Sequence, residues 1–144
     1  MYVKDCMSTQ ITTVPPGMLV QTAYQIMTMR GARIRHVPVV TAQGSLVGVV
    51  TDRDIRRASA SDAPQMAAHE LPYLLEKLRV QDIMTRQVIT VRATTPLVQA
   101  GLLLLQNKFG CLPVVRNDDT LEGMLTVTDV LRHYVAQYDA GRMP

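Results

Sequence analysis

The chain lacks any long apolar segment, because its longest uninterrupted apolar run is the short stretch Leu102 to Leu105. A membrane-spanning helix needs about 18 or more such residues, so the sequence predicts that the protein neither spans nor inserts into a membrane. Asp5 stands where a signal peptide would begin its apolar region, which argues against export. We therefore expect a cytoplasmic protein.

Cysteine is also scarce. Cys6 and Cys111 are too few and too far apart for a disulfide framework or a zinc site, which needs clustered ligand pairs. The three histidines share no metal-ligand spacing and have no motif partner that would make a nucleophile or a general base; they are His36, His69 and His133. We predict reduced structural thiols, no metal site, no catalytic residue and no enzymatic activity.

The net charge of the chain is also small. Fifteen Lys and Arg against twelve Asp and Glu leave a net charge of +3, and the positive residues are scattered along the chain. Nucleic-acid binding is therefore weakly supported. With 144 residues, 47% of them hydrophobic, the chain has room for one ordinary globular domain or for two small halves that share a core.

An internal repeat organises the whole chain. A shift of 77 residues superimposes Val3, Asp5 and Met7 on Val80, Asp82 and Met84. Further along, a shift of 75 residues matches two longer sets, namely Pro38, Val39, Val40, Leu46, Gly48, Thr51, Asp54 and Arg57 with Pro113, Val114, Val115, Leu121, Gly123, Thr126, Asp129 and Arg132. The matches keep their order, which indicates a duplicated unit.

In both copies the spacing of the hydrophobic residues changes in the same order along the chain, from strand-like to helix-like and back. In the first copy, residues 11–14 predict a short strand, residues 19–31 a helix, residues 37–40 and 46–51 two strands joined by a turn, and residues 52–58 a closing helix. The second copy repeats the series and closes with a longer helix over residues 128–138.

The predicted fold class is therefore α/β (α+β), with two β-α-β-β-α repeats packed face to face in pseudo-twofold symmetry. We expect repeat 1 at residues 1–58, a helical linker at residues 59–79, and repeat 2 with a C-terminal helix at residues 80–144. One such unit alone would be marginally stable, which favours packing the two copies together.

Each copy ends its last strand with the pattern Gly-x-x-Thr-x-x-Asp, which has two interpretations. As a ligand site, the carboxylate accepts both hydroxyls of a ribose, the helix N-terminus suits a phosphate, and the glycine lets the ligand approach the backbone. As a capping box, the threonine hydroxyl and the acid only satisfy free amides of the helix start. The residue types alone leave both interpretations open.

The quoted segments, taken together and in order, resemble the paired CBS domains, regulatory modules named after cystathionine β-synthase. The likeness covers nearly the whole chain and includes Ile34 to Val40, Gly110 to Val115 and both Gly-x-x-Thr-x-x-Asp endings. The segment from Glu70 to Leu78, running into the second copy, resembles the CBS region of acetoin-utilisation-type proteins.

This resemblance implies two ligand sites, in the clefts between the two repeats, for an adenine nucleotide (AMP, ADP or ATP) or a related adenosyl ligand, with no obligatory cofactor. Asp54 and Asp129 would hold ribose hydroxyls, while Thr51 and Thr126 would contact ribose or phosphate. Backbone near the following residues would bracket the adenine: Thr12, Thr13, Ile89, Thr90, His36, Val37, Pro38, Cys111, Leu112 and Pro113.

Phosphate groups need cations, and the two copies differ in what they offer. Copy one has Arg33, Arg35, His36 and Arg53, whereas Lys108 is the nearest equivalent in copy two. We expect unequal sites, although the sequence does not indicate which binds more tightly. Arg35 and Arg53 have a second interpretation as solvated surface charges.

The leading hypothesis is thus a non-catalytic regulatory module that binds an adenosyl ligand, forms a homodimer and signals to an unidentified regulated protein. The first alternative is a constitutive dimerisation or interaction module whose ligand pockets are degenerate. Nucleic-acid binding is a more distant alternative, and an enzyme is the most distant.

Overall fold

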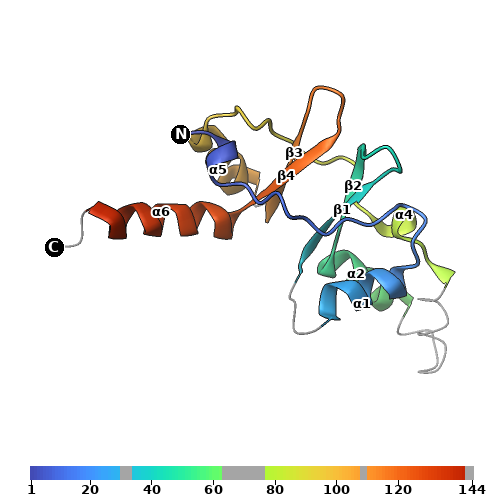
Figure 1. Ribbon diagram of the computed structural model, residues 1–144. Coiled ribbons are helices and arrows are strands. Elements are labelled where there is room, and N and C mark those ends of the chain that lie inside the picture. The colour runs from blue at the N-terminus through green and yellow to red at the C-terminus, as the bar shows by residue number, and fades with distance from the viewer. Residues whose placement is uncertain (30–33, 63–76, 108–109, 142–144) are drawn as a thin grey trace. The chain divides into compact units, whose positions relative to one another are not determined.

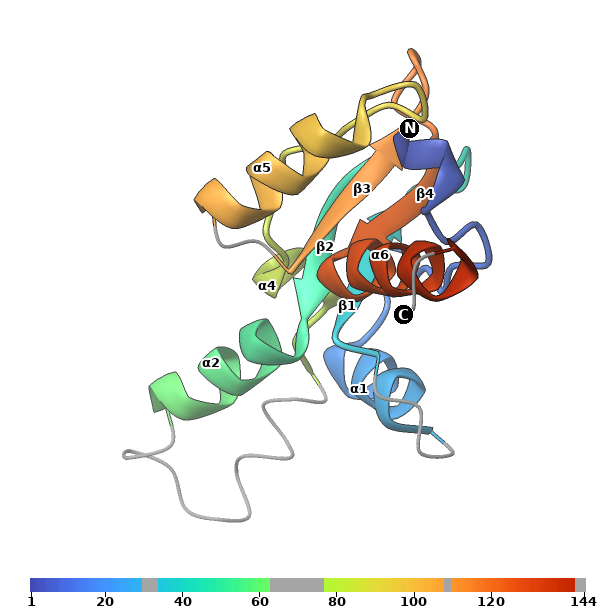
Figure 2. The same ribbon diagram turned by 90° about the vertical axis from the view of Figure 1, so that its left-hand side faces the viewer.

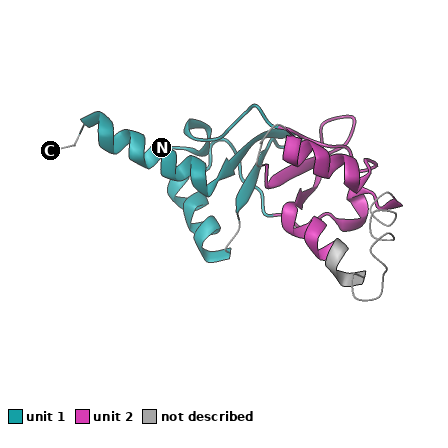
Figure 3. Ribbon diagram, turned by 90° about the horizontal axis from the view of Figure 1, so that it is seen from below, with its two compact units in different colours: residues 1–11, 89–144 teal, residues 12–88 magenta. Residues whose placement is uncertain are grey.

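The computed structural model describes residues 1–29, 34–62, 77–107 and 110–141. The chain divides into two compact units, with residues 1–11 and 89–144 in unit 1 and residues 12–88 in unit 2 (Figure 3). Each unit has one antiparallel two-stranded sheet accompanied by helices. The predicted mixture of helix and strand is therefore confirmed.

Unit 2 contains the first predicted hairpin. Its elements are α1 (Val20–Thr28), β1 (His36–Val40), β2 (Leu46–Thr51), α2 (Asp52–Asp62) and α4 (Val80–Ile83). The strands pair from His36 opposite Thr51 to Val40 opposite Leu46. Figures 1 and 2 both show α1 and α2 on the same side of this hairpin. Gly44, in the turn, has φ 87°, a conformation that glycine adopts without steric cost.

Unit 1 repeats this plan. Its elements are η1 (Val3–Asp5), α5 (Leu97–Asn107), β3 (Cys111–Val115), β4 (Leu121–Thr126) and α6 (Val127–Gly141). Cys111 lies opposite Thr126, as His36 lies opposite Thr51 in unit 2. Figure 1 shows α6 running away from the end of β4.

The bounds of three predicted elements are wrong. Residues 11–14 form no strand, because only Val14 pairs, in an isolated parallel bridge to Val39. Pro15 and Pro16 have no amide hydrogen, so the ladder cannot continue beyond Val14. Val91 of the second copy also forms only an isolated bridge, although no proline follows it, so the short contact is common to both copies. The closing helices are longer than predicted, since α2 reaches Asp62 and α6 spans Val127–Gly141. Gly31 and residues 63–76 of the predicted linker lie outside the described residues.

The boundaries of the two units differ from those of the two sequence repeats. The first segment of each repeat belongs to the unit that contains the rest of the other repeat. The start of the first copy belongs to unit 1, where the Val3 amide donates to the Thr95 carbonyl over 2.9 Å. The start of the second copy belongs to unit 2, where the Val80 amide donates to the Met18 carbonyl over 2.8 Å. Val3 and Val80 are both fully buried, each in the core of its unit. Each core is thus completed by a segment of the other sequence copy.

The exchanged segments cross directly over the glycines of the repeated motif. Thr85 and Val49 exchange two backbone hydrogen bonds of 2.9 and 3.0 Å, and Ser8 and Met124 exchange two of 2.9 Å. A Cβ on Gly48 would lie 2.8 Å from the Thr85 carbonyl oxygen, and one on Gly123 would lie 3.0 Å from the Ser8 carbonyl oxygen. Our expectation that these glycines leave room for a ligand is therefore wrong, because the chain itself fills that space.

Burial perturbs the histidine that opens β1. His36 is half-buried, and this desolvation lowers its pKa below the ordinary value of 6.5. Asp52 and Asp54 act in the opposite direction, while Arg35 lowers the pKa further. His36 is therefore neutral at neutral pH.

Replacing Gly48 or Gly123 by alanine should lower the free energy of unfolding by about 1–3 kcal/mol, because the new methyl group would overlap a backbone oxygen. The matched control is Gly101→Ala in α5, where a Cβ meets no atom within 4 Å and the helix should gain roughly 0.5–1 kcal/mol. Urea unfolding of the three variants measures the difference. Equal stability of all three would contradict the crossing contact.

The stability should also fall as the pH drops below about 6.5, because unfolded His36 takes up a proton more readily than folded His36. The decrease should run from that pH down to the lowered pKa of the folded state. His36→Gln removes the titrating group and should flatten this part of the curve. Urea unfolding of both proteins across the range is the measurement, and identical slopes would disprove the assignment.

Candidate functional site

The predicted site residues of copy one all lie in unit 2, at one end of its hairpin. Thr51 ends β2 and lies opposite His36, which begins β1. The Asp52 amide donates to the Arg35 carbonyl over 3.2 Å, which joins the start of α2 to the residue before β1. The structure therefore brings the Thr-x-x-Asp motif and the segment 35–38 together.

A third segment joins the same end of the hairpin. The Val14 amide donates to the Pro38 carbonyl over 3.1 Å, and the Val40 amide donates to the Val14 carbonyl over 3.0 Å. Because this bridge is parallel, Thr12 and Thr13 precede it on the side where β1 begins. Both threonines are exposed. The three segments named for the first copy thus meet at one end of the hairpin.

Unit 1 repeats this arrangement for the second site. The Val91 amide donates to the Pro113 carbonyl, and the Val115 amide donates to the Val91 carbonyl, each over 3.0 Å. Ile89 and Thr90 are exposed and precede the bridge, beside the start of β3. Each predicted set of residues therefore belongs to a single unit.

A reciprocal cap forms in both units. The Thr51 amide donates to Oδ2 of Asp54 over 2.9 Å, and the Asp54 amide donates to the Thr51 hydroxyl over 3.0 Å. Thr126 and Asp129 make the same two bonds, of 2.9 and 3.1 Å. The capping interpretation is thus confirmed as structure. It leaves Oδ1 of each aspartate outside the cap, so a cap and a ligand contact are compatible.

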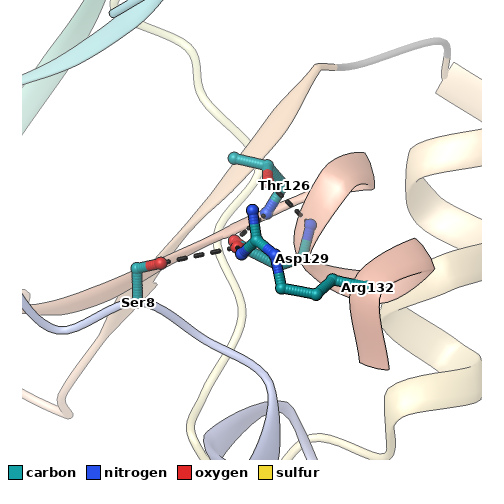
Figure 4. Close-up of polar contacts among 4 residues, drawn as sticks. All are labelled: Ser8, Thr126, Asp129 and Arg132. Carbon is teal, nitrogen blue, oxygen red and sulfur yellow. Dashed lines mark hydrogen bonds and ion pairs between the residues drawn. The ribbon is translucent and has the colours of Figure 1, made fainter. Parts of the chain in front are cut away.

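The two aspartates differ in what surrounds that second oxygen. Oδ1 of Asp129 lies 3.4 Å from the Ser8 hydroxyl and 3.4 Å from a guanidinium nitrogen of Arg132, as Figure 4 shows. Asp129 is only 8% exposed. Asp54 is half-buried, and the described part of the chain offers its carboxylate no hydrogen-bond partner beyond Thr51. The carboxylate of the first site is therefore the more open.

Sequence reasoning missed Ser8 and Arg132 as neighbours of the site. Arg132 matches Arg57 in the repeat, one turn after each aspartate, and that match was the signal that could have identified it. Ser8 lies 121 residues from Asp129 in the sequence. Only the exchange of the first segments brings it to the second site.

Several predicted residues can meet a ligand only through their backbone. Val37, Pro38, Leu112 and Pro113 are fully buried, so their side chains belong to the core. Cys111 is also buried, which raises the pKa of its thiol to about 12 and keeps it protonated. A nucleophilic role for Cys111 therefore finds no support.

The structure describes some of the cations proposed for phosphate binding. Arg35 and Arg53 are exposed, and each is next to, or two residues from, the paired residues His36 and Thr51 at the end of the hairpin. Arg33 and Lys108, named for the same role, lie outside the described residues.

The described residues can also be searched for metal ligands and for membrane-spanning helices. Among those residues, no three His, Cys, Asp or Glu side chains are grouped so that they could hold a metal ion. No helix in the described part of the chain has the length and apolar character needed to cross a membrane.

Comparison with known proteins agrees with this architecture. A model of the CBS domain matches residues 3–61 and 80–136. A CBS domain-containing protein of Dictyostelium discoideum is 33% identical over 132 residues, which cover 90% of this chain and 88% of that protein. The homoserine O-acetyltransferase of Methanohalobium evestigatum is 30% identical over 131 residues, which cover 91% of this chain. The chain spans only 24% of the length of that enzyme.

Solved structures are similar over almost their whole length. CBSX2 in complex with AMP is 32% identical with a TM-score of 0.78, and the match covers 94% of this chain and 97% of that one. A putative acetoin utilization protein, AcuB, from Vibrio cholerae is 26% identical with a TM-score of 0.80, covering 100% and 98%. The CBS domain pair of protein MJ0100, in complex with 5′-methylthioadenosine and S-adenosyl-L-methionine, is 27% identical with a TM-score of 0.76, covering 93% and 99%.

The family match spans both halves of the chain, and each half contains the hairpin, the crossing segment and the capped aspartate described above. The chain belongs to the CBS domain family and carries a tandem pair of CBS domains.

Proposed function

We propose that this chain is a regulatory module without catalytic activity, which binds an adenine nucleotide or a related adenosyl ligand and signals to a partner protein. AMP, ADP, ATP and S-adenosylmethionine are the candidate ligands. The signal requires a partner, or a second site, that distinguishes the liganded from the unliganded state, because a ligand shifts an equilibrium only by its difference in affinity.

The observation that carries this proposal is the open carboxylate of Asp54. It lies where three predicted segments converge, its Oδ2 is fixed by the Thr51 amide, and its Oδ1 is outside the cap. A fixed carboxylate beside exposed backbone and two exposed arginines suits a ribose phosphate. The complexes of CBSX2 with AMP and of MJ0100 with two adenosyl compounds support the same ligand class.

We propose further that the site at Asp54 binds more tightly than the site at Asp129. A ligand at the second site has to displace the Ser8 hydroxyl or the Arg132 guanidinium from Oδ1 before it can use that atom. The first site needs no such exchange and has Arg35 and Arg53 nearby. The sequence predicts two sites of unequal affinity, and we therefore propose that the site at Asp54 has the higher affinity.

We also propose a homodimer in the cytoplasm. The free thiols of Cys6 and Cys111 agree with a reducing compartment. Exposed apolar side chains on α5 and α6 support self-association.

The alternative, a constitutive interaction module, is favoured by one observation. The caps are complete without any ligand, and the motif glycines are explained by the crossing segments. The motif could then serve the fold alone, and the two functions must be separated by experiment.

A thermal-shift panel of nucleotide-stripped protein with AMP, ADP, ATP, S-adenosylmethionine and NAD separates them. A ligand at a hundred times its Kd should stabilise the native state by about 2.7 kcal/mol, which raises the Tm. No shift with any of the five ligands, in a protein that unfolds cooperatively, would support the constitutive module instead.

Asp54→Asn should weaken the binding of the ligand so identified by about ten- to a hundredfold, because a charge-assisted hydrogen bond to the ribose is lost. Asp129→Asn should change the tighter binding constant much less. Asp139→Asn is the matched control, since Asp139 is an exposed aspartate of α6 in unit 1, whereas Asp54 lies in unit 2. Isothermal titration calorimetry measures all three, and a larger effect of Asp129→Asn would reverse the order of the sites.

A further inference from the structure

The two candidate sites share one backbone framework but differ in the charges around it. Residues 35–57 contain four Arg and two Asp, a net charge of +2, whereas the matching residues 110–132 contain two Arg, three Asp and one Glu, a net charge of −2. The shift of 75 residues replaces Arg35, Asp52, Arg53 and Arg56 by Gly110, Val127, Thr128 and Leu131. The repeat therefore places the same capped aspartate in two different electrostatic surroundings.

The charges at the turn of the second hairpin contribute little to this difference. Strand β3 (Cys111–Val115) has five residues, so the turn beyond it lies more than about 13 Å from Cys111 at a rise of about 3.3 Å per residue. The Debye length at physiological ionic strength is about 8 Å, so charges at that distance are largely screened. The charged side chains beside each aspartate therefore decide which ligand a site attracts.

Three guanidinium groups near the first site are unpaired. Arg35, Arg53 and Arg57 are exposed, and none of them forms an ion pair within the described part of the chain. Arg56 does form one, with Asp52 over 2.8 Å, so the charges of these two residues offset each other. A phosphate monoester carries a charge of about −1.5 to −2 at pH 7, and arginine binds it through two parallel hydrogen bonds. The first site is therefore suited to a phosphorylated ligand.

The arginine at the second site is already paired. A guanidinium nitrogen of Arg132 lies 3.4 Å from Oδ1 of Asp129 (Figure 4), and Asp129 is only 8% exposed. A phosphate that drew Arg132 away would leave a buried carboxylate without its ion pair, which is strongly unfavourable. A ligand without phosphate needs only the Ser8 hydroxyl to move from Oδ1, and it leaves the ion pair intact.

The exposed neighbours of the second site are apolar. Val127 directly follows Thr126 and is 52% exposed, and Leu131, one turn further along α6, is 59% exposed. These two residues stand where the first site has the ion pair of Asp52 and Arg56. Apolar side chains contact a sulfur or methyl group favourably but offer no hydrogen bond to a phosphate.

We propose that the two sites bind different classes of adenosyl ligand. The site at Asp54 binds a nucleotide with at least one phosphate, and the site at Asp129 binds an adenosyl thioether or sulfonium compound, which carries no phosphate. 5′-Methylthioadenosine and S-adenosylmethionine are the two sources of that chemistry, the first uncharged and the second with a sulfonium cation. This inference rests on the proposed function, and it makes the chain a module that responds to two ligands.

Isothermal titration calorimetry of the full chain with AMP, 5′-methylthioadenosine and S-adenosylmethionine tests the assignment. Asp54→Asn should weaken AMP binding by about ten- to a hundredfold and leave the affinity for the sulfur compound within about twofold. Asp129→Asn should do the reverse. The sulfur compound that responds to Asp129→Asn identifies which of the two sources the site prefers. A variant that weakens both classes equally would overturn the proposal.

Competition in the unchanged protein gives the same answer and does not depend on the folding of a variant. Protein saturated with AMP should still bind one equivalent of the sulfur compound with its Kd unchanged within about twofold. If both ligands occupied the same site, the apparent Kd would instead rise in proportion to the AMP concentration, and the proposal would be wrong.

Exchanging one matched pair of residues tests the role of the arginines. Arg53→Thr should weaken AMP binding by about tenfold and leave the binding of adenosine unchanged, because only the phosphate contact is lost. In an Asp54→Asn background, Thr128→Arg should raise the affinity of the second site for AMP relative to adenosine. The control is Arg116→Gln, which removes an exposed arginine next to the turn of the second hairpin and should change neither affinity. An equal loss of AMP and adenosine binding in Arg53→Thr would contradict the phosphate contact.

The outcomes separate this inference from the proposed function. Binding of AMP and the sulfur compounds to one shared site overturns the division between the sites and leaves the ligand proposal intact. Absence of binding by every adenosyl compound removes both.

Discussion

The close approach of two backbone segments at Gly48 and Gly123 is the constraint on which both halves of the molecule depend. At each glycine, a segment from the other sequence copy crosses the strand and exchanges two backbone hydrogen bonds with it. The same segments place Val3 and Val80 in the two cores, where both are fully buried. A side chain on either glycine would hold the crossing segment away from the strand and open the core beneath it. Both the hydrogen bonds of the crossing segment and the packing of the core therefore require a glycine, without a Cβ, at these two positions.

The candidate sites follow from this arrangement. The segment that bridges through Val14 or Val91, the end of the second strand and the cap of the next helix all meet at one end of each hairpin, so polar groups gather there for structural reasons. In each cap, Oδ2 of the aspartate accepts a hydrogen bond from the threonine amide, and Oδ1 is available to other neighbouring groups. In unit 2 those surroundings are open, whereas in unit 1 they are Ser8 and Arg132. One repeated framework thus produces two sites with different requirements for a ligand.

The sequence predicts those parts of the molecule that depend on local pattern. Runs of β-branched residues locate the strands of both hairpins, and the Thr-x-x-Asp spacing offers the reciprocal caps at Asp54 and Asp129 as one of two interpretations. It does not predict the exchange of the first segments, because Ser8 and Asp129 are joined only in three dimensions. It also assigns the motif glycines to a ligand when a neighbouring carbonyl occupies that space. The strand predicted over residues 11–14 is reduced to one bridge at Val14, and the matching residue Val91 of the second copy also forms only an isolated bridge.

The exchange of first segments has a consequence for how such a chain can be inherited. A gene fragment that encoded residues 1–58 alone would carry the first hairpin without the α4 segment that covers its Gly48, and it would carry η1 without the hairpin that η1 completes. The second copy alone would have the reciprocal defect. Recombination that shuffles single copies therefore produces two unfinished cores, whereas transfer of the whole pair keeps both intact. The duplicated pair, and not the single repeat, is the smallest portable unit of this architecture.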